Sequence, residues 1–543
     1  MRKAYKRTLL IAGLAAVGCV AGWLLAESGK EKLKPAEELQ ATDGNGGKAP
    51  AVRGQVGGPS GREPLQWWDD RLRDAERAGQ WSVAADYAYR KAAFYRSEGM
   101  EKEAAEWDAA SDAYWARDEV KDKRFYDGVP SETNAANASA ISPYVSVAVE
   151  EGRELAKFEP RSGVYLGMFG IFDWPSVEKT FGRYHPIGLT YSGWRKDEND
   201  TRNYFPTRLV DSVKAAGGGA VQIGWEPQYG LDSVKDDDYV RSFARQAKEA
   251  GIPIFLRYAS EMNGAWVPWY DEPAKYVEKF RLISRIMKEE APNVAMVWSP
   301  NFWPPDNVGD YYPGDEYVDW VGFSLYATPL FDGKEDFSKN LIDYFIPLYN
   351  RYAHKPIMIS EGAVSHYYRP AEKNYAKWAE GQLGNMYGFL PRLFPQVKAM
   401  TYFNMTKART ETLKGDHLYD LKENPLMFDL YRRLIGSDYF LSKVEQGSRT
   451  AENVRYVPLE SAAGLAGKRK LFAYVRLPGD AQPRSVAVLQ GGRKLAETFE
   501  MPWEVELDFS ALDPLLPLEF VAYNGKREEL ARKTVTLANG GSR

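Results

Sequence analysis

Two glutamates, Glu261 and Glu361, each stand at the end of a short apolar segment, and paired carboxyl groups can cleave a glycosidic bond. Glu261 follows residues 252–258 (IPIFLRY), and Glu361 follows residues 355–360 (KPIMIS). Runs of this length with two largely apolar faces are typical of strands in a parallel sheet covered on both sides. A retaining glycosidase needs one carboxyl as acid and one as nucleophile, roughly 5–5.5 Å apart. A glutamate that caps a strand within an ion pair is the alternative for either residue taken alone.

The elements that would position these carboxyl groups are eight strand candidates separated by helix-like spacers. This alternation predicts a parallel α/β fold, and its length of about 280 residues fits a (β/α)8 TIM barrel, in which the carboxyl ends of all strands share one face. A doubly wound sheet is the alternative, but no glycine-rich phosphate loop follows the first strand. The candidates are Gly163–Phe169, Ile187–Tyr191, Ala220–Trp225, Ile252–Tyr258, Val294–Trp298, Trp320–Leu325, Pro356–Ser360 and Val397–Phe403.

Four motifs in one order carry a resemblance to a known family. They are RYASEMNG around Glu261, WSPN at 298–301, YPGDEYVDWVGFSLY at 312–326, and KPIMISEG around Glu361. With them, residues 158–436 resemble the family-26 glycoside hydrolases, which are β-mannanases and related endo-β-glycanases built on a (β/α)8 barrel. The resemblance implies that the glutamate after the fourth strand is the acid/base and the glutamate after the seventh is the nucleophile.

Further residues in or beside these motifs are candidates for binding the sugar. The resemblance implies that Tyr326 hydrogen-bonds the nucleophile, although a tyrosine at the barrel rim is the alternative. Arg257 could instead be an ion-pair partner inside the barrel, and the tryptophans could be sugar-stacking platforms or ordinary loop packing. Glu226, in GWEP after the third strand, is interpreted as a substrate-binding or supporting carboxylate. The complete candidate set is Arg257, Asn263, Trp266, Trp269, Trp298, Asn301, Trp303, Tyr326 and Glu226.

Two positions depart from the family pattern. Ser260 stands where these enzymes usually carry a histidine immediately before the acid/base, and the eighth strand ends in Tyr402-Phe403-Asn404 where a tryptophan is common. Serine is shorter than histidine and never cationic. The expected reaction type therefore transfers better than the substrate preference of a mannanase.

The composition excludes several other functions. The chain has 71 basic and 75 acidic residues, so nothing predicts a nucleic-acid surface. Its single cysteine excludes an intrachain disulfide, and its four histidines show no metal-ligand spacing, so we expect no metal and no cofactor. Aromatic residues make up 14 %, which suits stacking on sugar rings as well as core packing.

The amino-terminal residues 1–26 are typical of an export or anchor segment. Basic residues precede an uncharged run from Thr8 to Ala26, which as a helix would be about 28 Å long, close to the ~30 Å hydrocarbon core of a bilayer. We therefore expect a signal anchor that holds the protein on the extracytoplasmic face of the cell membrane. A lipoprotein modified at Cys19 and a cleaved, secreted form are the alternatives.

A helical region and a carboxyl-terminal region flank the predicted barrel. The helical one resembles a tetratricopeptide-type repeat and is expected to pack on the barrel or on a protein partner, with a plain helical spacer as the alternative. The carboxyl-terminal one resembles bacterial immunoglobulin-like β-sandwiches, and a structural spacer is favoured over a carbohydrate-binding module. The predicted order is an anchor (1–26), a flexible linker (27–63), the helical segment (64–122), a second linker (123–157), the barrel (158–440) and the sandwich (445–543).

The leading hypothesis is an exported, membrane-tethered endo-β-glycosidase that hydrolyses a β-linked polysaccharide by retaining double displacement. The polysaccharide would be β-mannan-like, a mixed-linkage glucan or an exopolysaccharide. The alternatives are a non-catalytic polysaccharide-binding scaffold and a trimming enzyme or transglycosylase of exopolysaccharide assembly.

Overall fold

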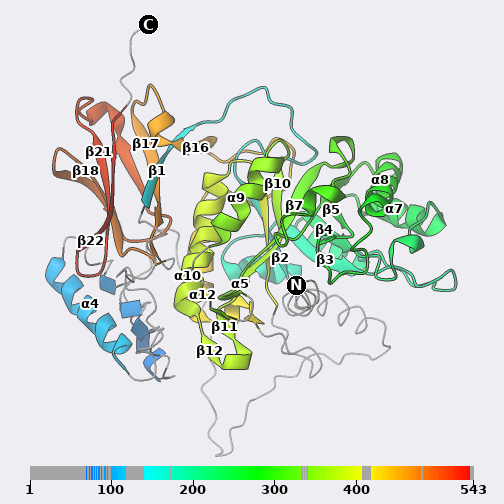
Figure 1. Cartoon of the computed structure of the whole chain (residues 1–543), viewed down its shortest axis with the longest axis horizontal. Coiled ribbons are helices and arrows are strands. Elements are labelled where there is room, and N and C mark those ends of the chain that lie inside the picture. Colours follow the sequence, from blue (N-terminus) through cyan, green and yellow to red (C-terminus); the bar gives the residue numbers. More distant parts are fainter. Residues whose placement is uncertain are drawn as a thin grey trace, which may run out of the picture.

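The structure is a computed structural model of the 543-residue chain. Figure 1 shows a barrel beside a smaller β-rich region, with a helix (α4) lying next to the latter. The described residues are 100–117, 140–171, 173–331, 334–335, 337, 340–405, 417–478 and 481–537, together with single residues between 69 and 95.

Eight parallel strands form a closed barrel, which confirms the predicted (β/α)8 fold. The sheet runs in chain order from β2 to β13, and β13 pairs back with β2, so that the strands close on themselves. All eight predicted strands are present, and three have the predicted bounds. They are β2 (Val164–Phe169), β3 (Ile187–Ser192), β4 (Ala220–Trp225), β5 (Ile254–Tyr258), β6 (Val294–Trp298), β7 (Trp320–Ala327), β10 (Ile357–Val364) and β13 (Val397–Phe403).

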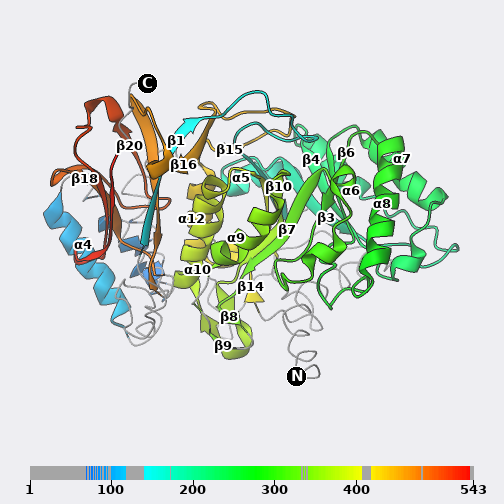
Figure 2. The ribbon, with the colours of Figure 1, turned by 45° about the horizontal axis from the view of Figure 1, so that its top comes forward.

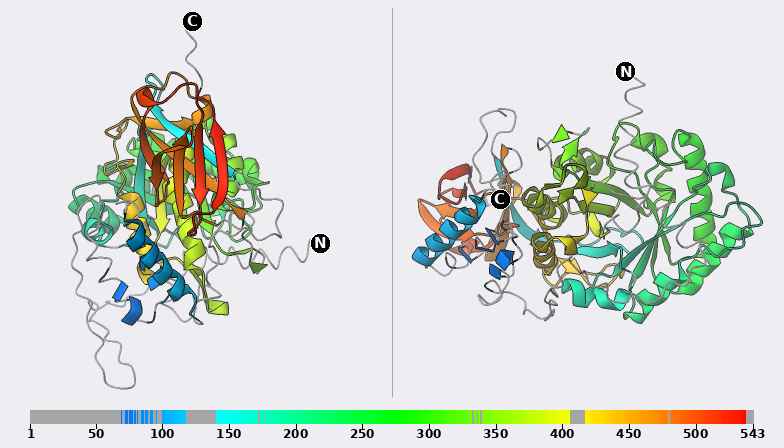
Figure 3. Two further views of the ribbon diagram at one scale, coloured as in Figure 1. Left: turned by 90° about the vertical axis from the view of Figure 1, so that its left-hand side faces the viewer. Right: turned by 90° about the horizontal axis from the view of Figure 1, so that it is seen from below.

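Helices cover the outside of the barrel, as Figure 3 shows from below. The helix-like spacers predicted after the third and fourth strands are the helices α7 and α8. After β6 the connection consists of two short 3₁₀ helices, Val308–Tyr311 and Asp315–Tyr317, rather than an α-helix. The α-helices of this layer are α5 (Val177–Phe181), α6 (Thr207–Ala215), α7 (Asp238–Ala250), α8 (Pro273–Glu290), α9 (Leu341–Tyr352), α10 (Ala376–Leu383), α11 (Leu390–Leu393) and α12 (Pro425–Ile435).

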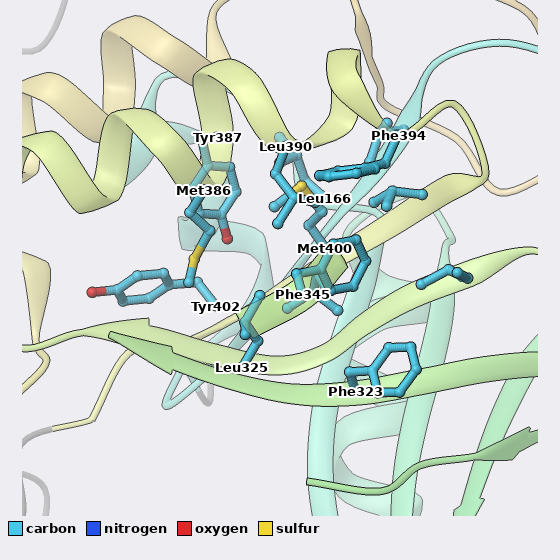
Figure 4. Packing of buried hydrophobic residues seen from close by; sticks show 14 of the residues in the cluster. Leu166, Phe323, Leu325, Phe345, Met386, Tyr387, Leu390, Phe394, Met400 and Tyr402 are labelled. Atoms are coloured by element: carbon cyan, nitrogen blue, oxygen red, sulfur yellow. The ribbon is translucent and has the colours of Figure 1, made fainter. Parts of the chain in front are cut away.

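Alternate residues of each strand point outward to these helices or inward into the barrel. Figure 4 shows outward side chains of β7 and β13, among them Phe323 and Met400, in one buried cluster with Phe345 of α9 and with Tyr387 and Leu390 from the helical segment that follows β10. Inside the barrel a separate apolar cluster, including Phe255, fills the amino-terminal half of the strands. The polar side chains are thereby left to the carboxyl-terminal half.

The carboxyl-terminal region consists of two four-stranded antiparallel sheets. One has the order β16-β1-β17-β20 and the other β19-β18-β21-β22. Apolar side chains from both sheets belong to one buried cluster. The strands are β1 (Ala140–Ala148), β16 (Val454–Pro458), β17 (Lys468–Arg476), β18 (Ser485–Gln490), β19 (Arg493–Thr498), β20 (Glu504–Asp508), β21 (Leu518–Tyr523) and β22 (Glu529–Val535).

The strand β1 corrects the interpretation of residues 123–157 as a linker. It lies in the middle of its sheet, paired with β16 on one side and β17 on the other. Sequence reasoning missed it because Pro143 cannot donate a ladder hydrogen bond and argues against a central strand. Its partners, such as Arg455 opposite Val147, also lie beyond the whole barrel in the chain.

Direct contacts join this region to the helices of the barrel, and Figure 2 shows α9, α10 and α12 between the two. Arg476 of β17 forms a bidentate ion pair with Asp343 of α9, at 2.8 and 2.6 Å. The α12 residue Arg433 donates a 3.0 Å hydrogen bond to the carbonyl of Met501. These contacts fix the sandwich against the outer layer of the barrel.

The described part of the helical segment packs on the barrel, one of the two expected locations. Leu72 and Tyr87 share a buried cluster with Ala376 of α10 and Leu426 of α12. Tyr87 also donates a hydrogen bond to Asp429 of α12. The helix α4 spans Glu101–Trp115. The resemblance of the helical segment to a tetratricopeptide-type repeat, and that of the carboxyl-terminal region to an immunoglobulin-like module, stay predictions.

The predicted anchor (1–26) and first linker (27–63) lie outside the described residues. Of the helices in the described ranges, none combines the length and the apolar character needed to cross a bilayer.

The central position of β1 predicts a stability effect. Val145 is fully buried in this strand, whereas Ser142 is exposed. Val145→Ala should lower the free energy of unfolding by about 2 kcal/mol because it removes buried methyl groups and leaves a cavity. Ser142→Ala is the matched control and should change it by less than about 0.5 kcal/mol. Urea denaturation followed by tryptophan fluorescence measures both, and equal midpoints for the two variants would contradict the core position of β1.

Candidate active site

Glu361 lies inside β10, where an irregularity in the strand turns it toward the barrel axis. The pairing of β10 with β7 shifts register between Ile359 and Glu361. Such a bulge redirects a side chain. As a result Ser360 and Glu361 both reach polar partners within the barrel, although adjacent strand residues normally face opposite ways: the Ser360 hydroxyl lies 2.7 Å from that of Ser299.

Three donors surround the Glu361 carboxylate. The Arg257 guanidinium donates to it at 2.5 Å, and the hydroxyl groups of Tyr191 and Tyr326 also donate to it. Only 4 % of Glu361 is exposed, so these contacts replace water. A buried carboxylate with a guanidinium partner and two hydroxyl donors is well stabilised in its charged form.

Arg257 ties several strand ends together. It is completely buried on β5, and its other nitrogens donate to Ser299 after β6 at 2.8 Å and to Ser324 on β7 at 2.6 Å. Burial disfavours its charge, but the acidic groups around it, Glu361 first among them, together outweigh that effect, and the pKa of Arg257 is raised. The arginine is therefore cationic at neutral pH.

Glu261 sits in a tight turn directly after β5. Both Ala259 and Glu261 have left-handed backbone conformations, with φ of 46° and 56°. The carboxyl accepts a 2.9 Å hydrogen bond from Asn301 and a 2.8 Å hydrogen bond from the indole of Trp266. Gly264 is required beneath this indole, because a Cβ there would lie 2.2 Å from the ring.

The two carboxyl groups therefore have different surroundings. Burial raises the pKa of Glu261, the negative charge of Glu361 raises it further, and Arg257 opposes both effects only in part. The partners in direct contact with Glu261 are neutral, whereas Glu361 contacts the cation. A carboxyl group with a raised pKa beside one that contacts a guanidinium matches the division of roles between an acid and a nucleophile.

A third carboxyl group, Glu226, lies one residue beyond β4 and is also buried. It accepts hydrogen bonds from the Ser260 hydroxyl at 2.7 Å and from the Ser260 backbone N–H at 3.2 Å. Burial raises its pKa to about 8, against the opposing charge of Arg257. Gly224 leaves room for the ring of Tyr191, since a Cβ at this position would lie 2.6 Å from that ring.

The structure brings most of the predicted residues together. Arg257, Trp266, Asn301 and Tyr326 all touch one of the two catalytic candidates, as the preceding contacts show. Trp303, partly exposed, follows Asn301 and donates its backbone N–H to that side chain at 3.0 Å.

Three predicted sugar-binding residues also make contacts within the protein, and their sugar-binding role stays a prediction. Trp298 is fully buried, and its indole donates to the carbonyl of Tyr311, because alternate residues of β6 face the helices. Asn263 is fully buried, and its amide bridges to the loop after β6, where it binds the backbone of Asn301. Trp269 is nearly buried and donates to the carbonyl of Ser260.

Sequence reasoning missed three residues of the site: Tyr191, Ser299 and Ser324. Tyr191 ends a predicted strand, and the two serines lie within quoted motifs, so their position at strand ends was the available signal. Their small or common side chains gave no chemical reason to select them. Their role comes from contact with Arg257 and Glu361.

The fold and the site together define a (β/α)8 barrel protein with a pair of unequal carboxyl groups after its fourth strand and in its seventh. Residues 233–353 match the family model of Glycosyl hydrolase family 26. This region contains Glu261, Asn301 and Tyr326, and it ends before Glu361.

Curated relatives act on different polysaccharides, as their names state. Endoglucanase H of Acetivibrio thermocellus is 27 % identical over 364 residues, which cover 62 % of this chain and 35 % of that protein. Beta-1,3-xylanase TXYA of a Vibrio species is 32 % identical over 130 residues, covering 23 % and 26 %. A mannan endo-1,4-beta-mannosidase of Bacillus subtilis is 34 % identical over 94 residues, covering 15 % and 26 %. The chain thus spans about a third or less of the length of each of these relatives.

The buried Glu226 predicts a pH-dependent stability. Its pKa rises from 4.5 in the unfolded chain to about 8 in the folded one, so the folded protein binds the proton more tightly. The resulting stabilisation is fully present below pH 4.5 and is lost as the pH rises through 8, with a slope of at most about 1.4 kcal/mol per pH unit.

Glu226→Gln removes this titration. The melting temperature of the wild-type protein should therefore fall relative to that of Glu226→Gln between pH 5 and pH 8.5, whereas the two should run in parallel below pH 4.5. Differential scanning calorimetry across this range is the measurement. A constant difference at every pH would show that Glu226 has an ordinary pKa.

Proposed function

We propose that this protein is a retaining glycoside hydrolase that cleaves internal β-linkages of a polysaccharide. Glu361 is the nucleophile and Glu261 is the acid/base. The observation that carries the proposal is the unequal pair itself: Glu361 in contact with the Arg257 guanidinium, and Glu261 buried with neutral donors.

The two carboxyl groups perform two displacements. In the first, an oxygen of Glu361 attacks the anomeric carbon while Glu261 donates its proton to the departing oxygen, so a glycosyl ester forms and the glycosidic bond breaks. In the second, ionised Glu261 removes a proton from water, which attacks the same carbon and releases Glu361. Arg257, Tyr191 and Tyr326 hold Glu361 in line, and the anomeric configuration is retained.

The substrate class is supported by the relatives and limited by this chain's own residues. The matched proteins are named as an endoglucanase, a β-1,3-xylanase and a mannan endo-1,4-β-mannosidase, and the last two names state a β-linkage. Ser260, bound to Glu226, cannot supply the charge or reach of a histidine. We therefore propose a β-linked polysaccharide as substrate, with mannan, mixed-linkage glucan, β-1,3-xylan and exopolysaccharide as the candidates to test.

The activity predicts a specific pattern of loss. Residues 64–543 incubated with this panel should release reducing ends from at least one polysaccharide. Glu361→Ala should abolish the release, and Glu261→Ala should reduce it by about 10²–10⁴-fold, as expected for loss of a general acid. Proton NMR of the first product should show a β-anomer.

Three outcomes would contradict the proposal. Binding without cleavage, retained in Glu361→Ala, would indicate a polysaccharide-binding scaffold. Transfer of the cleaved chain to another sugar in preference to water would indicate a transglycosylase of exopolysaccharide assembly. An α-anomer as the first product would indicate an inverting enzyme.

We also propose that residues 1–26 tether the protein to the cell membrane, with the barrel on the extracytoplasmic side. The support is the uncharged run from Thr8 to Ala26 behind basic residues. In a bacterial host the full chain should stay in the membrane fraction after an alkaline carbonate wash, and Cys19→Ser should not release it. Release of Cys19→Ser would indicate a lipoprotein, and recovery of the wild-type protein in the medium would indicate secretion.

A further inference from the structure

We propose that Glu226 is a positioning residue for Glu261, acting through Ser260, in the hydrolase proposed above. In this role Glu226 holds the turn 259–261 in the conformation that presents the acid to the glycosidic oxygen. The inference rests on the proposed function, and it gives the third buried carboxyl group of the site a part that neither displacement uses.

The turn needs such a support because its backbone is strained. Ala259 and Glu261 both lie in the left-handed region, which costs a residue with a side chain on the order of 1–3 kcal/mol. Strained conformations persist only where surrounding contacts over-determine them. Ser260 is the residue between the two strained positions, so contacts to Ser260 decide whether the turn is kept.

Every polar group of Ser260 is engaged. Glu226 binds both its hydroxyl and its backbone N–H, and the indole of Trp269 donates to its carbonyl at 2.8 Å. Neighbouring backbone bonds anchor the turn at its sides: Ala259 donates to Trp225, and Glu261 donates to Ser299. Among the groups that contact the turn in these hydrogen bonds, Glu226 is the side chain that binds two groups of Ser260.

Glu226 is itself held rigidly for this task. It directly follows β4, and its backbone N–H donates a 2.9 Å hydrogen bond to the carbonyl of Ser192 at the end of β3. Only 2 % of the residue is exposed, and both oxygens face Ser260. Because both oxygens are used by Ser260, the side chain supports the turn, which favours the supporting role over the substrate-binding one.

The chemistry of the contact allows a neutral side chain to replace the glutamate. One carboxyl oxygen accepts from the Ser260 N–H and the other accepts from the Ser260 hydroxyl, which can also rotate to accept a hydrogen bond. The amide of glutamine offers an oxygen that accepts from the N–H and an NH₂ that donates to the hydroxyl oxygen. Leucine has a similar volume but can make neither contact. Glu226→Gln should therefore keep the turn, and Glu226→Leu should release it.

Leaving-group dependence separates a displaced acid from general damage to the pocket. In an aryl β-glycoside, 2,4-dinitrophenolate is a good leaving group and departs without protonation. The 4-methylphenolate is a poor leaving group and needs a proton from the acid. Each of cellobiose, mannobiose and β-1,3-xylobiose is prepared with both leaving groups. The disaccharide whose two glycosides the wild-type protein cleaves is then used for the variants. The measurement is kcat/KM, which reports the first displacement.

For Glu226→Leu we expect kcat/KM on the 4-methylphenyl glycoside to fall by about 100-fold and that on the dinitrophenyl glycoside by less than about threefold, because an acid contributes 10²–10⁴-fold. Glu226→Gln should stay within about threefold of wild type on both. Ser260→Ala, which keeps the backbone contact, should show a smaller loss of the same kind and serves if Glu226→Leu does not fold.

The matched control is Glu159→Gln, a change of another buried carboxylate that pairs with Arg153 before β2, away from the site. It should leave both kcat/KM values unchanged. An equal loss on both glycosides in Glu226→Leu, no loss on either, or a Glu226→Gln as impaired as Glu226→Leu would each overturn the positioning role. If the wild-type protein cleaves none of the probes and no polysaccharide of the panel, the proposed function fails, and the role of Glu226 fails with it.

Discussion

The buried ion pair between Arg257 and Glu361 is the interaction on which the rest of the site depends. Removing one partner of such a pair typically costs 3–5 kcal/mol, because the other charge is left uncompensated. From β5 the guanidinium reaches Tyr191 on β3, Ser299 after β6 and Ser324 on β7. A single side chain therefore holds the ends of several strands in register around the carboxylate.

The same ion pair gives the three buried carboxyl groups of the site different electrostatic surroundings. Arg257 supplies one positive charge to three buried acids, and it contacts only Glu361 directly among them. Glu261 and Glu226 lie in its field but bind neutral donors, and burial raises the pKa of each. The raised pKa values of Glu261 and Glu226 disfavour further negative charge beside the Arg257–Glu361 ion pair, which limits the net charge of this buried site.

The barrel and the carboxyl-terminal sheets are connected through the strands at which the chain enters and leaves the barrel. The chain enters the barrel from β1 and leaves it toward β16, and these two strands pair with each other. At the barrel itself a short strand, β15 (Phe440–Leu441), pairs with β2. Entry and exit are thus held side by side by backbone hydrogen bonds. The barrel is inserted between two strands of the sandwich, and the sandwich is not an appended module.

The sequence by itself determined the order of strands and helices, the barrel and the two glutamates, because local apolar patterning and a carboxyl group after a strand are readable within a few residues. It could not determine contacts made across the barrel. The bulge that aims Glu361, the grip of Glu226 on Ser260 and the outward burial of Trp298 follow from register between strands. The place of β1 in its sheet also depends on strand pairing, because its partners β16 and β17 follow the whole barrel in the sequence. Only the tertiary structure decided these features, since each depends on which residues strand pairing places next to one another.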